Sequence, residues 1–197
     1  FLSTLSSGVF VSTDATNWSA IGTTLPSIKG FASLDGILYA ASYGNGVYKS
    51  LDSGQTWVTA NTGLSEQDIW AIGACDSVLY VGVSSGHIYK STNAGLSWGL
   101  CNSNNTFNAG IGSIAYCGTT LIAGSHGSGL FISTNYASTW TSANTIGTVE
   151  IRSLISNGSL VFAGTDMLGI YKSTNNGYYF SLSNSGLTSN WIQAFAF

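Results

Sequence analysis

The segment SLDSGQTW, residues 50–57, places a carboxylate, hydroxyls and an indole within one short stretch of chain. It could be a binding site, since Asp52 can accept hydrogen bonds from a ligand and the Trp57 ring can stack against one. It could equally be a tight turn, because Asp side chains bond nearby backbone amides and Gly54 tolerates a left-handed backbone. The rest of the chain decides between these interpretations.

Four further segments repeat this pattern: STDATNW at 12–18, STNAGLSW at 91–98, STNYASTW at 133–140 and STNNGYYF at 173–180. Their terminal aromatic residues follow one another at intervals of 39 to 42 residues. Three of the five copies carry Asn where the others carry Asp, and Asn has no charge. A turn needs only an acceptor, so a structural role is expected for Asp14, Trp18, Asp52, Trp57, Asn93, Trp98, Asn135, Trp140, Asn175 and Phe180.

Each copy is preceded by three apolar, strand-like runs, of which the last resembles GVYKS at 46–50. A fourth, short run follows the aromatic residue that ends the copy. The 25 glycines and the lack of helical periodicity also favour short strands joined by turns. Four strands in a period near 40 residues are typical of a propeller blade. We therefore predict an all-β fold, a β-propeller of about five four-stranded blades in one domain over residues 1–197.

The pattern Ser-x-Asp-x-Gly-x-x-Trp resembles the Asp-box (BNR) repeat of sialidases, sortilin-type receptors, photosystem assembly factors and several bacterial lectins. This resemblance covers nearly the whole chain and implies a β-propeller. It does not imply one function, because such proteins include enzymes, receptors and scaffolds.

The two ends of the chain match complementary parts of one blade. The first residues align with a second strand and WIQAFAF, residues 191–197, aligns with a first strand. We expect one composite blade built from the N-terminal strands and the C-terminal strand, which would remove two exposed sheet edges. Two alternatives remain open: a slice of a larger propeller, or strand exchange with a neighbouring copy.

Enzymatic chemistry finds few candidates in this sequence. The resemblance suggests sialidase activity, which requires a cluster of arginines, and Arg152 is the single arginine. A glycosidase needs two carboxylates close together. Asp68 and Glu150 share one repeat position but belong to blades separated by another, so they are expected to lie apart. We therefore predict a protein that is not an enzyme.

Other classes of function are disfavoured by composition. Five basic residues and a net charge of −3 do not provide a phosphate-binding surface, so no nucleic acid partner is expected. No apolar run reaches the roughly 20 residues needed to insert into a membrane. The spacing of His87 and His126, to each other and to the three cysteines, does not suit a metal site, so we expect neither a metal nor a cofactor. We expect Cys75, Cys101 and Cys117 to be small, buried apolar residues.

The positions that differ between repeats are the candidates for ligand binding. They follow the first apolar residue of each first strand or lie in the loops between second and third strands. An aromatic ring flanked by polar side chains suits a neutral sugar. The candidate residues are Lys29, Tyr43, Trp70, His126, Arg152, Asp166 and Gln193.

We accordingly predict an extracellular or cell-surface binding module that recognises neutral glycans, in the manner of a lectin. Only 7 % of the residues are charged, so its surface must consist largely of neutral polar side chains. The alternative is a structural or adhesive subunit of a surface layer or filament, assembled by strand exchange or head-to-tail contacts.

Overall fold

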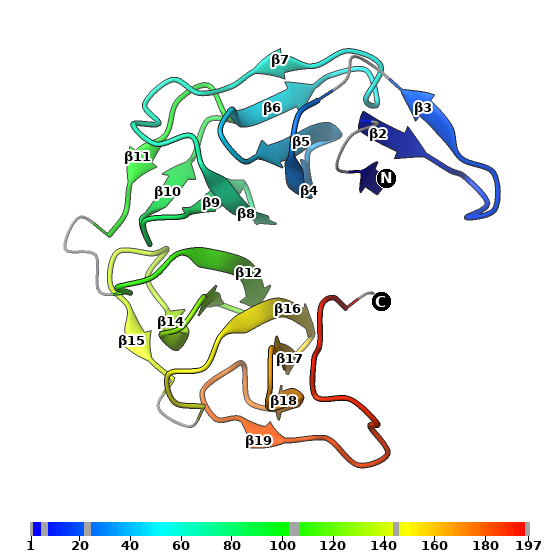
Figure 1. Cartoon of the computed structure of the whole chain (residues 1–197). Coiled ribbons are helices and arrows are strands. Elements are labelled where there is room, and N and C mark those ends of the chain that lie inside the picture. Colours follow the sequence, from blue (N-terminus) through cyan, green and yellow to red (C-terminus); the bar gives the residue numbers. More distant parts are fainter. Residues whose placement is uncertain (1, 5–7, 22–24, 103–106, 144–145, 196–197) are drawn as a thin grey trace. The chain divides into compact units, whose positions relative to one another are not determined.

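Figure 1 shows the computed structural model of the chain, which describes residues 2–4, 8–21, 25–102, 107–143 and 146–195. The strands form four four-stranded antiparallel sheets and one three-stranded sheet, and each strand pairs with its neighbours in sequence. This confirms the predicted all-β fold of about five blades. Within the described ranges, no helix is long and apolar enough to cross a membrane.

The chain forms two compact units: unit 1 comprises residues 1–83 and 89–100, and unit 2 comprises residues 84–88 and 101–197. The prediction of a single domain stays a prediction. Unit 1 carries three sheets. Their strands are β1 (Leu2–Thr4), β2 (Gly8–Val11) and β3 (Ser19–Ile21); β4 (Ile28–Leu34), β5 (Ile37–Ser42), β6 (Gly46–Ser50) and β7 (Val58–Thr59); and β8 (Ile69–Cys75), β9 (Val78–Val83), β10 (Ile88–Ser91) and β11 (Gly99–Leu100).

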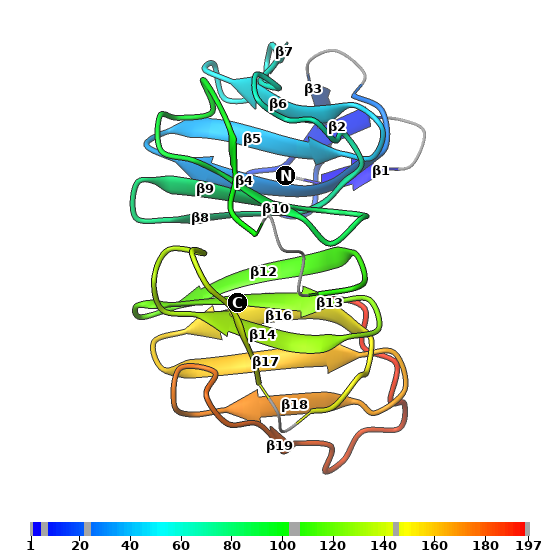
Figure 2. The same ribbon diagram turned by 90° about the vertical axis from the view of Figure 1, so that its left-hand side faces the viewer.

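Unit 2 carries two sheets, whose strands follow one another in chain order (Figure 2). Their strands are β12 (Ile111–Cys117), β13 (Thr120–Ser125), β14 (Gly129–Ser133) and β15 (Thr141–Ser142); and β16 (Ile151–Asn157), β17 (Leu160–Thr165), β18 (Ile170–Ser173) and β19 (Ser181–Leu182). Apolar side chains of these strands form the core of the unit, in which Ile151 and Val161 are fully buried.

In four of the five box segments, Ser and Asp or Asn side chains close the turn in the same way, whereas Asp14 in the first copy accepts the amides of Thr16 and Asn17. In the second copy, the Ser50 hydroxyl donates to Asp52 Oδ1 at 2.8 Å and accepts from the amide of Gly54 at 2.8 Å. Asp52 Oδ1 also accepts from the amide of Thr56 at 2.8 Å. Asn93, Asn135 and Asn175 accept the amide four residues on at 2.9, 2.9 and 3.0 Å. The turn therefore uses an acceptor and needs no charge.

The aromatic residues that end the boxes differ in their surroundings. Trp57, Trp98 and Phe180 are buried, whereas Trp18 is 44 % exposed. The Trp98 indole donates to the carbonyl of Ala60, which follows β7 of the preceding sheet. Trp98 thus joins neighbouring sheets of unit 1. Cys75 and Cys117 are buried, as expected of small apolar side chains, and Cys101 is partly buried.

A bulge interrupts the first strand of each four-stranded sheet. In β16 the pairing shifts between Ile151 and Ser153, which leaves Arg152 as the extra residue. The same shift leaves Lys29, Trp70 and Gly112 as extra residues in β4, β8 and β12. Bulges bend a strand and redirect a side chain, and they are common beside functional sites.

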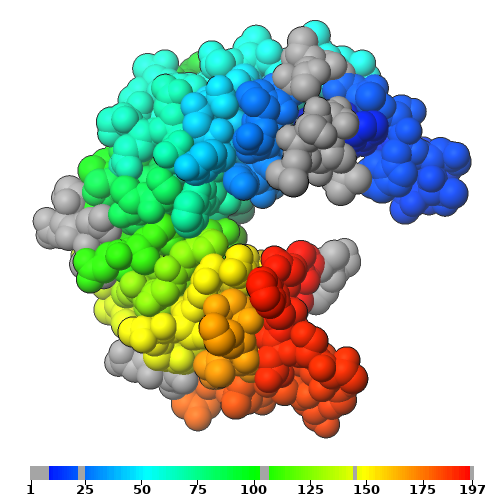
Figure 3. Space-filling view, in the orientation of Figure 1, coloured from blue at the N-terminus to red at the C-terminus, as the bar shows by residue number. Residues whose placement is uncertain are grey.

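The segment that follows β19 lies against the β16–β19 sheet, as the red and orange surfaces of unit 2 show (Figure 3). The amide of Ile192 donates to the carbonyl of Thr165 at 2.9 Å. A Cβ on Gly164 would collide with Ile192, as one on Gly124 would collide with Ile151. Ile192 thus occupies the place of a first-strand isoleucine. Residues 191–195 form no strand of their own, and the β1–β3 sheet has three strands, so the composite blade stays a prediction.

Candidate functional site

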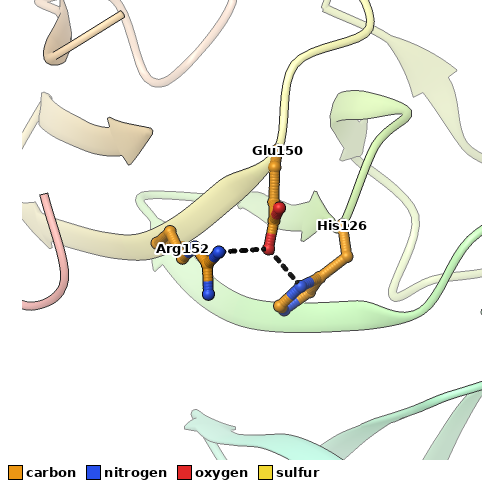
Figure 4. Close-up of polar contacts among 3 residues, drawn as sticks. All are labelled: His126, Glu150 and Arg152. Atoms are coloured by element: carbon orange, nitrogen blue, oxygen red, sulfur yellow. Dashed lines mark ion pairs between the residues drawn. The ribbon is translucent and has the colours of Figure 1, made fainter. Parts of the chain in front are cut away.

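Unit 2 gathers polar side chains at the end of the sheets where second strands lead into third strands and first strands begin. Glu150 Oε1 accepts from His126 Nδ1 at 2.6 Å and from an Arg152 Nη atom at 3.2 Å (Figure 4). His126 follows β13, Glu150 precedes β16 and Arg152 is the bulge residue of β16. A single carboxylate oxygen therefore connects two successive sheets of the unit. The three side chains are 24–30 % exposed, so they are ordered by packing yet reachable from solvent.

Backbone contacts place these side chains. His126 and Glu150 form an isolated antiparallel bridge, and the His126 amide donates to the carbonyl of Gly110 at 2.9 Å. The imidazole lies over Gly112, where a Cβ would collide with the ring. Gly112 occupies the bulge position that holds Arg152 in the next sheet, so the missing side chain leaves room for the histidine to reach Glu150.

An exposed tryptophan extends the site on the other side of Arg152. The Arg152 guanidinium carbon lies 5.5 Å from the centroid of the Trp191 ring, which is close enough for a cation–π contact. Trp191 is 57 % exposed. The amide of Asp166 donates to the carbonyl of Glu150 at 3.4 Å, so the loop after β17 borders the same site. We name His126, Glu150, Arg152 and Trp191 the unit 2 site.

This arrangement suits recognition of an uncharged polar ligand. Arg152 and Glu150 balance each other's charge, and the exposed tryptophan provides a flat apolar surface. Their remaining donors and acceptors can meet hydroxyl groups at the edge of a stacked ring. In the described part of the chain, no group of three or more His, Cys, Asp or Glu side chains could hold a metal ion.

Two predicted ligand residues, Lys29 and Tyr43, form a pair within unit 1. Lys29 Nζ lies 5.7 Å from the centroid of the Tyr43 ring, and Tyr43 is 46 % exposed. Trp70 is partly buried at the bulge of β8, and Gln193 in unit 2 is exposed. Of the predicted residues in unit 2, His126 and Arg152 meet at Glu150, and Asp166 reaches it through its backbone.

The sequence did not single out Glu150 or Trp191 as ligand-binding residues. Both occupy the position just before a first-strand isoleucine, where the other repeats carry Ser27, Asp68 and Gly110. This position varies as much as the bulge position does, and that variation was the available signal. The sequence pattern places Trp191 in an expected first strand, and it makes Glu150 a candidate only as a possible catalytic carboxylate.

A repeated asparagine that the sequence interpretation overlooked holds the loops beside these positions. Asn61, Asn102 and Asn184 each stand four residues after a box aromatic. Their side-chain oxygens accept the amides of Val47, Ile88 and Ile170 at 2.7, 2.6 and 2.8 Å. Their amide groups donate to the carbonyls of Asn45, Gly86 and Leu168 at 3.0, 2.9 and 2.7 Å. Each asparagine thus pins the loop between a second and a third strand.

Comparison with known proteins defines the architecture. No protein-family model matches the sequence, and neither does any curated protein. The extracellular domain of a proposed one-component system from B. thetaiotaomicron matches with a TM-score of 0.74 at 19 % identity, over 96 % of this chain and 27 % of that one. An ancestral GH74 enzyme matches with a TM-score of 0.65 at 25 % identity, over 81 % of this chain and 25 % of that one. The chain has a β-propeller fold.

A GH74 xyloglucanase from Xanthomonas campestris also matches, with a TM-score of 0.65 at 14 % identity, over 95 % of this chain and 32 % of that one. The chain thus spans between a quarter and a third of the length of these propeller proteins. The prediction that the protein is not an enzyme is contradicted, because GH74 enzymes are among the structures it resembles. Counting arginines excluded sialidase chemistry alone, and glycoside hydrolysis does not require an arginine cluster.

Proposed function

We propose that the protein binds neutral glycans through the unit 2 site, as part of an extracellular Asp-box β-propeller. The observation that carries the proposal is the exposed Trp191 ring, set against a guanidinium that Glu150 anchors. A sugar ring can stack on the open part of the indole while its hydroxyl groups bond to Glu150, Arg152 and His126.

The geometry favours an uncharged ligand over an anionic one. The positive charge of Arg152 is already opposed by Glu150, and His126 shares the same carboxylate oxygen. An anionic ligand would have to compete with Glu150 for the guanidinium. A neutral ligand adds hydrogen bonds without disturbing this pair, which keeps the loops of both sheets in place.

Two comparisons support a carbohydrate ligand and an extracellular location. The protein from Xanthomonas campestris is named a xyloglucanase, and the one from B. thetaiotaomicron is an extracellular domain. The five box turns and their repeated hydrogen bonds support membership of the Asp-box propellers. Xyloglucan fragments are therefore the first ligands to test.

The deciding experiment is isothermal titration of the chain with xyloglucan oligosaccharides, cellohexaose and mannohexaose. We expect Trp191→Ala to weaken binding about tenfold, because roughly 1.4 kcal/mol corresponds to tenfold and aromatic stacking contributes on this order. New reducing ends are measured in the same mixtures, so that hydrolysis is detected alongside binding.

Tyr179→Ala is the matched control. Tyr179 is a 59 % exposed aromatic residue in the box turn at the other end of β18, so its loss should leave the affinity unchanged. Failure of all three oligosaccharides to bind, or equal affinities for the Trp191→Ala variant and the wild type, would refute the proposal.

A further inference from the structure

We propose that unit 1 holds a second glycan-binding site, formed by Lys29, Tyr43 and Asp68 and independent of the unit 2 site. The inference rests on the proposed function for its ligand class, a neutral sugar ring. Its residues come from the β4–β7 sheet and from the start of β8, all within unit 1.

Tyr43 provides an exposed platform in a loop that is held from both sides. Its amide donates to the carbonyl of Ser27 at 3.0 Å, and its carbonyl accepts from Asn45 Nδ2 at 3.3 Å. Asn61 fixes the far side of the loop through Val47 and Asn45. A platform that is already ordered loses little conformational entropy when a ligand stacks on it.

The close approach of Gly46 to Asn61 explains how the loop is closed. Gly46 has a φ of +77°, and a Cβ there would collide with the Asn61 side chain. A glycine is therefore required for the asparagine to reach the loop. The Tyr43 ring is presented by a turn of defined shape and not by a freely moving segment.

A donor and an acceptor flank this platform. Lys29 Nζ lies over the Tyr43 ring at 5.7 Å from its centroid. An ideal Cβ on Gly44, the residue after Tyr43, would lie 3.9 Å from Asp68 Oδ1, so the carboxylate borders the same turn. An ammonium group and a carboxylate beside one aromatic ring can bond adjacent hydroxyl groups of a sugar, one as donor and the other as acceptor.

The same chemistry stands at corresponding repeat positions in unit 2. Lys29 and Arg152 are bulge residues of β4 and β16. Asp68 and Glu150 each precede a first-strand isoleucine. In both units a cation lies over an exposed aromatic ring with a carboxylate nearby. The aromatic residue comes from different repeat positions, Tyr43 in one case and Trp191 in the other. The two sites therefore share no residue and are not copies of one repeated motif.

The test is an NMR titration of the intact chain with cellohexaose, because it reads each site separately. We expect saturable shifts of the Tyr43 and Gly44 amides and, with their own dissociation constant, of the Trp191 indole. Tyr43→Ala should weaken binding in unit 1 about tenfold and leave the Trp191 response intact. Tyr43→Phe retains the ring and should stay within about threefold of wild type.

The possible results separate this inference from the proposed function. Shifts confined to the Trp191 indole would overturn the second site and leave the first in place. Shifts confined to Tyr43 and Gly44 would support the second site and show that the unit 2 site does not bind cellohexaose, which leaves the xyloglucan oligosaccharides and mannohexaose as the test of that site. No shift of the Tyr43 and Gly44 amides would overturn the second site. Lys29→Gln tests the donor, and an affinity for cellohexaose in unit 1 equal to that of wild type would remove Lys29 from the site.

Discussion

Glu150 organises the unit 2 site through one atom. Its Oε1 meets both His126 and Arg152, and Arg152 in turn lies over Trp191. Three side chains, those of His126, Arg152 and Trp191, thus gather around a single carboxylate. The sequence identified His126 and Arg152 because they vary between repeats, but variation alone could not show that Glu150 joins them.

At the same scale, the box aspartates carry a testable pH dependence. Hydrogen bonds from the Thr56 hydroxyl and amide, and from the Ser50 hydroxyl, lower the pKa of Asp52 to about 2. A carboxyl whose folded-state pKa is depressed adds stability above its unfolded pKa, near 3.9, and this is lost as the pH falls through the folded value. We therefore expect the difference in melting temperature between the wild type and the Asp52→Asn variant, taken as wild type minus variant, to become smaller as the pH is lowered from about 4 to about 2.

Asn93→Asp provides the reciprocal control. Asn93 Nδ2 donates to the Ser97 hydroxyl at 2.9 Å, and that hydroxyl can turn to donate to a carboxylate as Thr56 does. The variant should gain the pH dependence that Asp52→Asn loses. Scanning calorimetry from neutral to acid pH measures both differences, and a difference that stays constant over this range would contradict the assignment.

At the scale of elements, the asparagine that stands four residues after three of the box aromatics, at positions 61, 102 and 184, connects the box turn to the loop between a second and a third strand. Asn102 is buried, accepts from the amide of Ile88 and donates to the carbonyl of Gly86. Asn102→Ala leaves two backbone groups without this partner, and an unsatisfied buried group costs roughly 1–3 kcal/mol. We expect the free energy of unfolding in urea to fall by about this amount.

Asn45→Ala is the comparison for this variant, because Asn45 makes an exposed 3.3 Å hydrogen bond to the carbonyl of Tyr43 within its own loop. Its loss should change the free energy of unfolding by less than about 0.5 kcal/mol. Equal effects of the two substitutions would show that the asparagine after the box does not hold its loop.

The positions of the β-bulges could not be predicted from the sequence. Lys29, Trp70, Gly112 and Arg152 occupy one position in the repeat, and the sequence shows that this position varies. The register shift that makes each of them the extra residue of a bulge depends on how two strands meet. A periodic pattern specifies the face to which a residue belongs, not the point at which the pairing slips.

At the scale of the whole molecule, the small number of charges predicts how binding depends on salt. The chain has five basic and eight acidic residues, and Arg152 is already paired with Glu150. Affinity for a neutral oligosaccharide should change less than about twofold between roughly 0.05 and 0.5 M NaCl, because no ligand charge is screened. Titrations at these salt concentrations measure it, and a fall of about tenfold would contradict binding without a net charge interaction.

Assembly into a filament or layer stays a prediction at this scale. Light scattering after size-exclusion chromatography measures the mass of the particle in solution.

The sequence by itself determined the repeat, the strands and the box turns, because all of these depend on local order. Alternating apolar residues specify strands, and a Ser or Asp side chain reaches amides within four residues along the chain. Only the tertiary structure decided which variable residues meet. His126 reaches Glu150 because Gly112 leaves space and neighbouring sheets pack side by side, and Trp191 reaches Arg152 because Ile192 docks on Gly164. Such contacts join residues far apart in sequence, so they follow from packing and not from pattern.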